Sequence, residues 1–178
     1  MKKSLLAGIL ILAIIFVLPV TLNAQEVNDF DLSDLSAVAG ISYTTFNEAD
    51  DGPGIYLGAG LEATPELFAV AQYERYFTSN LSLNGIAGTF SYDYSGLLDF
   101  APDLPELFIL GGLGYYFGEY DDNNDSEDVS GMGVRLGTGV AQEIAEDLDF
   151  RASLGYRLLD ADRDLSGFEV SGGISYSF

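Results

Sequence analysis

The chain has 178 residues, which is enough for one domain, and its composition excludes several classes of protein. It contains no Cys and no His, so disulfide bridges, thiol chemistry and histidine-based catalysis are excluded. The formal net charge of −21 argues against nucleic-acid binding, because phosphate contacts require clustered Lys and Arg.

Residues 1–24 are predicted to form a cleaved signal peptide. Two lysines follow the first Met, and Leu5–Val20 is almost uninterruptedly apolar, which is typical of a secretory signal. A retained membrane helix is the alternative, because Leu5–Leu22 approaches the length that spans a bilayer. Residues 25–34 are predicted to be a polar lead-in, and the folded domain is predicted to cover residues 35–178.

Beyond the lead-in, apolar residues alternate with small or polar residues, which is the period of a β-strand. The pattern is clearest at the end of the chain, where Phe168, Val170 and Ile174 alternate with Glu169 and Ser171. The predicted strands in chain order are Leu35–Phe46, Ile55–Leu61, Phe68–Phe77, Ile86–Phe100, Leu107–Phe117, Met132–Val140, Leu148–Leu158 and Phe168–Phe178.

The predicted links between these strands alternate between short and long. The short links are Thr64–Leu67, Ala101–Glu106 and Ala145–Asp147, and the longer links are Asn47–Pro53, Thr78–Asn84, Glu119–Ser130 and Asp160–Gly167. Short turns that alternate with longer loops are typical of an up-and-down barrel in an outer membrane. Both chain ends are then expected at the short-turn, periplasmic end.

Alternation alone does not decide which face of the strands points outward, since a soluble barrel that binds a small apolar ligand also alternates. The polar face here is mostly Gly, Ser and Thr, whereas soluble strands are rich in Lys and Glu. The apolar face carries aromatic residues near strand ends, including Phe77, Tyr116 and Phe168, as membrane barrels do. The acidic residues concentrate in the longer links. We therefore predict an all-β fold, an eight-stranded antiparallel up-and-down transmembrane β-barrel.

The final strand ends in Phe178 with Tyr176 two residues earlier. Together with the signal peptide and the alternating segments, this run resembles the small outer-membrane β-barrel family, the OmpA/OmpX-like, porin-like eight-stranded barrels. The resemblance implies a location in the bacterial outer membrane and an insertion signal at Tyr176 and Phe178. It also implies outer-membrane lipids and the outer-membrane insertion machinery as partners, a monomer, and no cofactor.

The predicted strand register points charged residues of both signs into the lumen. These residues are Glu62, Glu74, Asp93, Arg135, Glu143, Asp149, Arg151, Arg157 and Glu169. The planar guanidinium of Arg suits carboxylates, so we expect a hydrogen-bonded charge network that fills and rigidifies the barrel. An ion path is the alternative interpretation.

Two acidic stretches are weak candidates for binding divalent cations. Asp121, Asn123 and Asp125 have the spacing at which an EF-hand loop begins, but Ser126 and Met132 stand where that loop requires Gly and Glu. An EF-hand is therefore rejected, and loose binding of divalent cations remains the hypothesis, with a plain solvated loop as the alternative. The second candidate stretch consists of Asp160, Asp162 and Asp164.

These observations predict a non-enzymatic outer-membrane barrel with a structural or surface-interaction role and acidic loops exposed to the outside. Catalysis is not expected, because the chain lacks the residues on which most nucleophiles and general bases depend. A narrow channel for ions or small solutes is the first alternative. A soluble periplasmic barrel that binds a ligand is the second.

Overall fold

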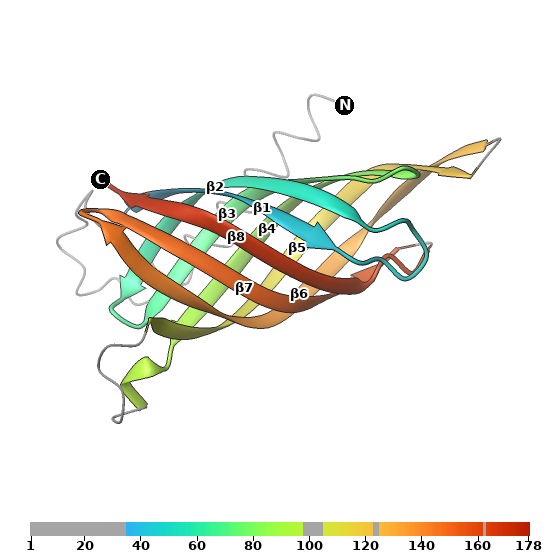
Figure 1. Cartoon of the computed structure of the whole chain (residues 1–178). Helices are drawn as coiled ribbons and strands as arrows, with labels where there is room; N and C mark the ends of the chain where they lie inside the picture. The colour runs from blue at the N-terminus through green and yellow to red at the C-terminus, as the bar shows by residue number, and fades with distance from the viewer. Residues whose placement is uncertain (1–34, 98–104, 123–124, 162) are drawn as a thin grey trace, which may run out of the picture.

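The computed structural model describes residues 35–97, 105–122, 125–161 and 163–178, so the predicted signal peptide and lead-in lie outside the described residues. Eight strands form a closed antiparallel barrel in which each strand pairs with the next and β1 pairs with β8 (Figure 1). The strands are β1 (Leu35–Thr44), β2 (Gly52–Thr64), β3 (Leu67–Phe77), β4 (Leu81–Asp93), β5 (Glu106–Asp122), β6 (Asp125–Ala145), β7 (Leu148–Asp160) and β8 (Gly167–Ser177). The predicted eight-stranded antiparallel barrel is confirmed.

The two ends of the barrel differ in what they carry. We call one the turn end, because it holds the C-terminus and the tight turns of β2–β3 and β6–β7 (Figure 1). The other is the loop end, where β1–β2, β3–β4, β5–β6 and β7–β8 are joined. Among the described residues, no helix is long and apolar enough to cross a bilayer.

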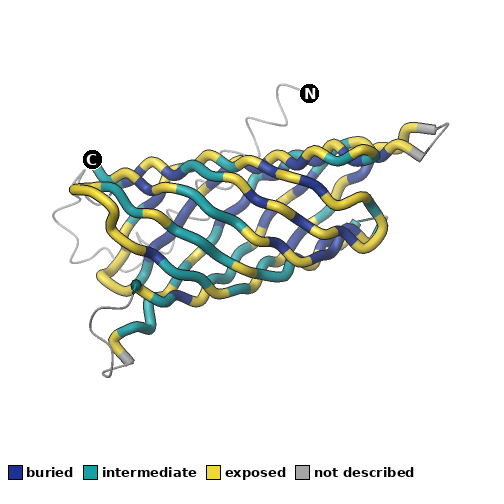
Figure 2. The backbone as a smooth tube through the Cα atoms, viewed as in Figure 1, coloured by how far each residue is buried: buried dark blue, intermediate teal, exposed yellow. Residues whose placement is uncertain are grey.

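Every strand carries exposed large apolar side chains on the outward face of the barrel. Large side chains such as Leu57, Leu113 and Leu136 are exposed over 65%, 62% and 61% of their surface. Figure 2 shows the resulting alternation, with exposed and more buried residues following each other along the strands. A soluble monomer rarely exposes so continuous an apolar surface, whereas a bilayer would cover it. The prediction that the apolar face points outward is confirmed.

Strand β4 differs from its prediction. It begins at Leu81 and ends at Asp93, so the predicted strand Ile86–Phe100 starts too late, and the predicted long link Thr78–Asn84 is wrong. The physical reason is that Leu81 and Leu83 are buried inside the barrel, where an apolar cluster fills the loop end. The alternation is therefore inverted in this part of the strand, and a search for outward apolar residues misses it. Phe100 lies outside the described residues.

The predicted acidic loop Glu119–Ser130 is also wrong, because most of it is strand. The ladder between β5 and β6 continues to the pair Asp122 and Asp125, far past the predicted strand ends. Water beyond the bilayer solvates the carboxylates of such a hairpin, so acidic residues do not have to end the strands there. Strand β6 is correspondingly longer than the predicted Met132–Val140.

The links at the turn end agree only partly with the prediction. Glu146 and Asp147 join β6 to β7, and Asp147 has a left-handed φ of 62°, which Asp tolerates better than most residues. The predicted short link Ala101–Glu106 is wrong, because the chain from β4 to β5 runs over residues 94–105 and includes the 3-10 helix η2 (Ser95–Leu97). The alternation of short and long links is therefore imperfect.

The outward face gives a first prediction. Replacing Leu136 with Arg places a charge against lipid, so the free energy of unfolding in vesicles should fall by about 2–4 kcal/mol. The matched control is Asp128→Arg, on the exposed part of the β5–β6 hairpin. This change should alter the free energy of unfolding by less than about 0.5 kcal/mol. Denaturant titration of the two variants measures both values, and equal effects would contradict the lipid contact.

Candidate functional site: a charged cluster in the barrel lumen

The inward side chains form layers along the lumen. Strand β3 shows the order, because Phe68, Val70, Gln72, Glu74 and Tyr76 follow one another from the turn end to the loop end and are all buried. Apolar and polar walls come first, a charged layer follows, and an apolar layer closes the loop end. The sequence of layers decides whether the lumen can act as a passage.

The charged layer contains two arginines and two glutamates from four different strands. Arg157 Nη2 lies 3.1 Å from Glu74 Oε2, and Arg135 Nη1 lies 3.4 Å from Glu74 Oε1. Glu169 forms ion pairs with both arginines. The side chains of Arg157, Glu74 and Glu169 are exposed by no more than 2%. We call these four residues the lumen charge cluster.

Neutral polar side chains complete the coordination of the two carboxylates. The Tyr76 hydroxyl lies 2.7 Å from Glu74 Oε2 and 2.8 Å from Glu169 Oε2, and Tyr116 donates to Glu74 over 3.1 Å. Gln72 Nε2 donates to Glu74, and Thr44 Oγ1 donates to Glu169. A buried charge is tolerated only when it is paired and hydrogen-bonded, and both glutamates meet that condition.

The rings of the two tyrosines also contact the buried guanidinium. Arg157 Cζ lies 4.5 Å from the centre of the Tyr76 ring and 4.8 Å from that of Tyr116. The faces of aromatic rings attract a cation, so the rings stabilise Arg157 where carboxylates do not reach it.

Tyr116 was predicted on the outward apolar face, and that prediction is wrong. Its ring lies inside the barrel against Gly85, Gly114 and Gly133, where a Cβ atom would overlap it. The sequence around Tyr116 is apolar on both faces of its strand, so alternation could not assign it. Gly85 and Gly133 of the neighbouring strands, with Gly114 of the same strand, leave the space that the ring fills.

An apolar cluster closes the lumen between the charged layer and the loop end. Its members come from the strands and from the links around the rim. They are Phe46, Tyr76, Leu81, Leu83, Tyr116, Tyr120, Val129, Leu159 and Leu165. Leu83 and Leu165 have no exposed surface.

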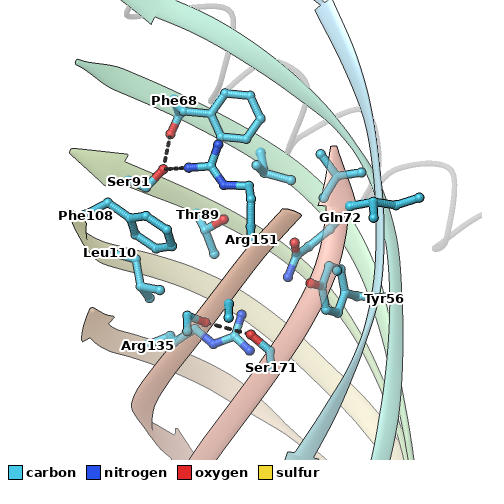
Figure 3. A pocket seen from close by; sticks show the side chains of 16 residues that line it. Tyr56, Phe68, Gln72, Thr89, Ser91, Phe108, Leu110, Arg135, Arg151 and Ser171 are labelled. Atoms are coloured by element: carbon cyan, nitrogen blue, oxygen red, sulfur yellow. Dashed lines mark hydrogen bonds between the residues drawn. The ribbon is translucent and has the colours of Figure 1, made fainter. Parts of the chain in front are cut away.

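Free space lies on the other side of the charged layer, toward the turn end. A cavity of about 70 Å³ is lined by Tyr56, Gln72, Arg135 and Arg151, among other residues (Figure 3). The Arg151 guanidinium lies 4.4 Å from the ring centre of Phe68 and 5.0 Å from that of Phe108, and donates to Ser91 Oγ over 3.1 Å. Of the lumen charge cluster, Arg135 borders this cavity.

The structure brings Glu74, Arg135, Arg157 and Glu169 together but leaves the other predicted lumen residues nearer the turn end. Glu62 and Asp149 lie close enough to Arg151 to interact with its charge. Asp93 accepts hydrogen bonds from the backbone and side chain of Ser95, so it caps η2. Glu143 is exposed, beside an irregularity in the β6–β7 ladder.

The predicted charge network did not include the polar residues that complete the cluster, namely Thr44, Gln72, Tyr76 and Tyr116. Tyr76 is two residues from Glu74 on β3 and so lies on the same face of the strand. This spacing was the signal that could have placed Tyr76 in the lumen. Thr44 lies opposite Glu169 in the β1–β8 ladder, a pairing that becomes visible only when the barrel is closed.

The candidate metal-binding residues are scattered. Asn123 and Asp162 lie outside the described residues, and Asp121 and Asp160 are exposed in strands. Asp164 accepts hydrogen bonds from Asn47 Nδ2 over 2.8 Å and from the Ser166 backbone over 3.1 Å, and these bonds hold its pKa below the usual range. Within the described residues, no group of three or more acidic side chains is placed to hold a metal ion.

The residues of the predicted insertion signal lie on the outward face at the turn end. Tyr176 and Phe178 are exposed, and their rings meet edge-to-face with centres 5.6 Å apart. Their recognition by the insertion machinery stays a prediction.

The apolar outward belt, the closed ladder and the filled lumen together define a transmembrane β-barrel. Residues 9–178 match the model of the family described as the outer membrane protein beta-barrel domain. The chain belongs to this family, and its location is the bacterial outer membrane.

Solved structures with the same fold come from several bacteria. Neisserial surface protein A is 19% identical, with a TM-score of 0.61 over 81% of this chain and 96% of that one. The N-terminal barrel domain of Pseudomonas aeruginosa OprF is 12% identical, with a TM-score of 0.57 over 82% and 98%. Ail, the attachment invasion locus protein of Yersinia pestis, is 15% identical, with a TM-score of 0.50 over 81% and 97%.

At these identities the likeness concerns the fold alone. No curated protein gives a significant match to the sequence.

The lumen charge cluster gives a second prediction. Replacing Arg157 with Met leaves two buried carboxylates with one arginine, so the free energy of unfolding should fall by about 3–5 kcal/mol. The matched control is Arg151→Met. Arg151 has aromatic contacts but no ion pair within hydrogen-bonding distance among the described residues, so this change should lower the free energy of unfolding by only about 1–2 kcal/mol. Denaturant unfolding in one detergent compares the variants, and equal losses would show that the cluster has no special role.

Proposed function

We propose that this protein is a non-enzymatic barrel of the outer membrane with a structural or surface-interaction role, which holds its acidic loop end toward the outside. The observation that carries the proposal is the closure of the lumen. Two successive layers, one charged and one apolar, fill it between the cavity and the loop end. A barrel that is filled in this way serves as a rigid support for the links and the hairpin at its loop end.

The narrow channel is the competing function, and the filled lumen argues against it. A permeating ion would have to pass the buried ion pairs of Arg157 and then the apolar cluster around Leu83 and Leu165. The energetic cost of separating a buried ion pair is high because the remaining charges lose their partners.

The chemistry of the lumen also favours a non-catalytic role. The chain has no His or Cys, and the two buried glutamates are engaged in ion pairs and hydrogen bonds. A general base must be free to take a proton from a substrate, and these carboxylates are already paired with arginine.

The loop end supports the surface-interaction part of the proposal. Short turns of bacterial outer-membrane barrels face the periplasm and the opposite rim faces outward. That rim is strongly acidic here, with Glu48, Asp50, Asp51, Asp121, Glu127 and Asp128 exposed. Ail is by its name an attachment protein, and for the present chain contact with outside molecules is the corresponding hypothesis. Outer-membrane lipids and the insertion machinery are the other proposed partners, and the proposed state is a monomer.

Planar-bilayer recording tests the proposal. The purified protein, inserted in a bilayer at moderate salt, is expected to give no discrete conductance steps because the lumen is closed. A porin reconstituted in parallel is the positive control for detection. Reproducible unit steps from the wild-type protein would support the channel instead.

A further inference from the structure

The β5–β6 hairpin has an unpaired edge at the loop end. Strand β6 pairs with β5 from Asp125 onward, but its pairing with β7 begins only at Met132, opposite Asp160. Figure 1 shows this hairpin reaching beyond the rest of the rim. Gly131 still lies against Asp160 at the end of β7, whereas the edge of β6 over Ser126–Ser130 has no neighbouring strand among the described residues, and we call it the free edge.

The direction of the backbone groups on the free edge follows from the ladder. The Asp121 N–H donates to the Asn80 carbonyl over 2.8 Å, so the backbone of Asp121 faces β4. Backbone direction alternates along a strand, and the neighbouring Tyr120 therefore faces β6, where Glu127 is its partner. The same alternation along β6 turns the N–H and C=O groups of Ser126, Asp128 and Ser130 away from β5, toward the free edge.

The hairpin is held firmly on its inner side. Val129 is 2% exposed and belongs to the apolar cluster that closes the lumen. Arg163, from the β7–β8 link, donates to Glu127 over 3.1 Å and lies 4.1 Å from the centre of the Tyr120 ring. The free edge is thus an ordered strand, and a partner that pairs with it does not have to order it first.

The charges around the free edge select the kind of partner. Glu119, Asp121, Glu127 and Asp128 are exposed on the hairpin, and Arg163 is the one cation in the described links of the loop end. Arg163 is already paired with Glu127. Like charges disfavour pairing with a second copy of the same edge, as charged residues on exposed strands generally do. A cationic strand meets no such barrier.

We propose that the free edge binds an extended, lysine- or arginine-rich segment of a partner protein by strand addition. This inference rests on the proposed function, since it requires the loop end to be accessible from outside. Hydrogen bonds to the backbone of Ser126, Asp128 and Ser130 supply the register. Basic side chains of the added strand lie opposite the carboxylates of the hairpin, and opposite charges on adjacent strands attract.

The experiment uses the wild-type protein in nanodiscs of zwitterionic lipid and a fluorescent peptide of alternating Lys and Val with blocked ends. Fluorescence anisotropy should show binding that weakens as salt is raised, because the contacts between exposed charges are screened. Empty nanodiscs and a peptide of alternating Glu and Val should show none.

Two variants separate strand addition from simple charge attraction. Asp128→Pro removes an N–H that points to the free edge and leaves the β5–β6 hydrogen bonds in place, so affinity should fall at least about tenfold. Asp128→Asn removes the same charge but keeps the N–H, so the affinity for the peptide should fall only about two- to threefold. Heat-modifiable gel mobility checks that both variants remain closed barrels.

Amide hydrogen exchange on the wild-type protein tests the same contact without any substitution. The peptide should slow exchange at Ser126, Asp128 and Ser130 and leave Glu127 unchanged. The inference is overturned if the peptide fails to bind, if Asp128→Pro binds as the wild type does, or if these amides are protected without peptide. It is also overturned if they become protected only as the protein dimerises. None of these results affects the conductance test, so failure here leaves the proposed function standing.

Discussion

The structure depends on one constraint, which is that lipid offers no hydrogen bonds to the backbone. Each N–H and C=O group in the bilayer must find its partner within the protein, and a sheet achieves this only when it closes on itself. The β1–β8 ladder closes this sheet, from Ser36 opposite Ser177 to Thr44 opposite Glu169. Closure leaves two surfaces, and the alternation of side chains along each strand assigns apolar residues to lipid and small or polar residues to the lumen.

Closure with eight strands creates a narrow interior that side chains must fill. Large residues fit only where neighbouring strands carry glycine, as Tyr116 does beside Gly85 and Gly133. Polar residues fit only where their charges are matched, as in the cluster of Arg135, Arg157 and the two glutamates. The filled interior makes the barrel a firm base for the loop end, and the ordered β5–β6 hairpin extends from that base.

Much of this architecture could be predicted from sequence where the lumen is polar. Strands β7 and β8 alternate cleanly, because glycine, serine and arginine face inward along most of their length, and their predicted ranges agree closely with the structure. Prediction failed at β4 and at the tip of the hairpin. At β4 the lumen becomes apolar around Leu83, which inverts the pattern, and at the hairpin the ladder continues into water, where acidic residues are tolerated.

The lumen charge cluster could be predicted only in part. The alternation of side chains along each strand indicates that Glu74 and Asp93 both face inward. It does not give the position of each residue along the barrel axis. These positions depend on the stagger between strands, which is a property of the closed barrel. The stagger brings Glu74 level with Arg157 and leaves Asp93 at the turn end, where it caps η2.

The contact between the outward face and lipid can be measured directly, because the chain has no Cys and single labelling sites can be introduced freely. Nitroxide labels at Leu136 and Leu154, on the outward face, are compared with a label at Asp128 on the hairpin. Dissolved oxygen should relax the first two labels strongly while a water-soluble nickel chelate leaves them unaffected, and the label at Asp128 should show the opposite. Access of the nickel chelate to Leu136 and Leu154 in the bilayer-reconstituted protein would contradict the account.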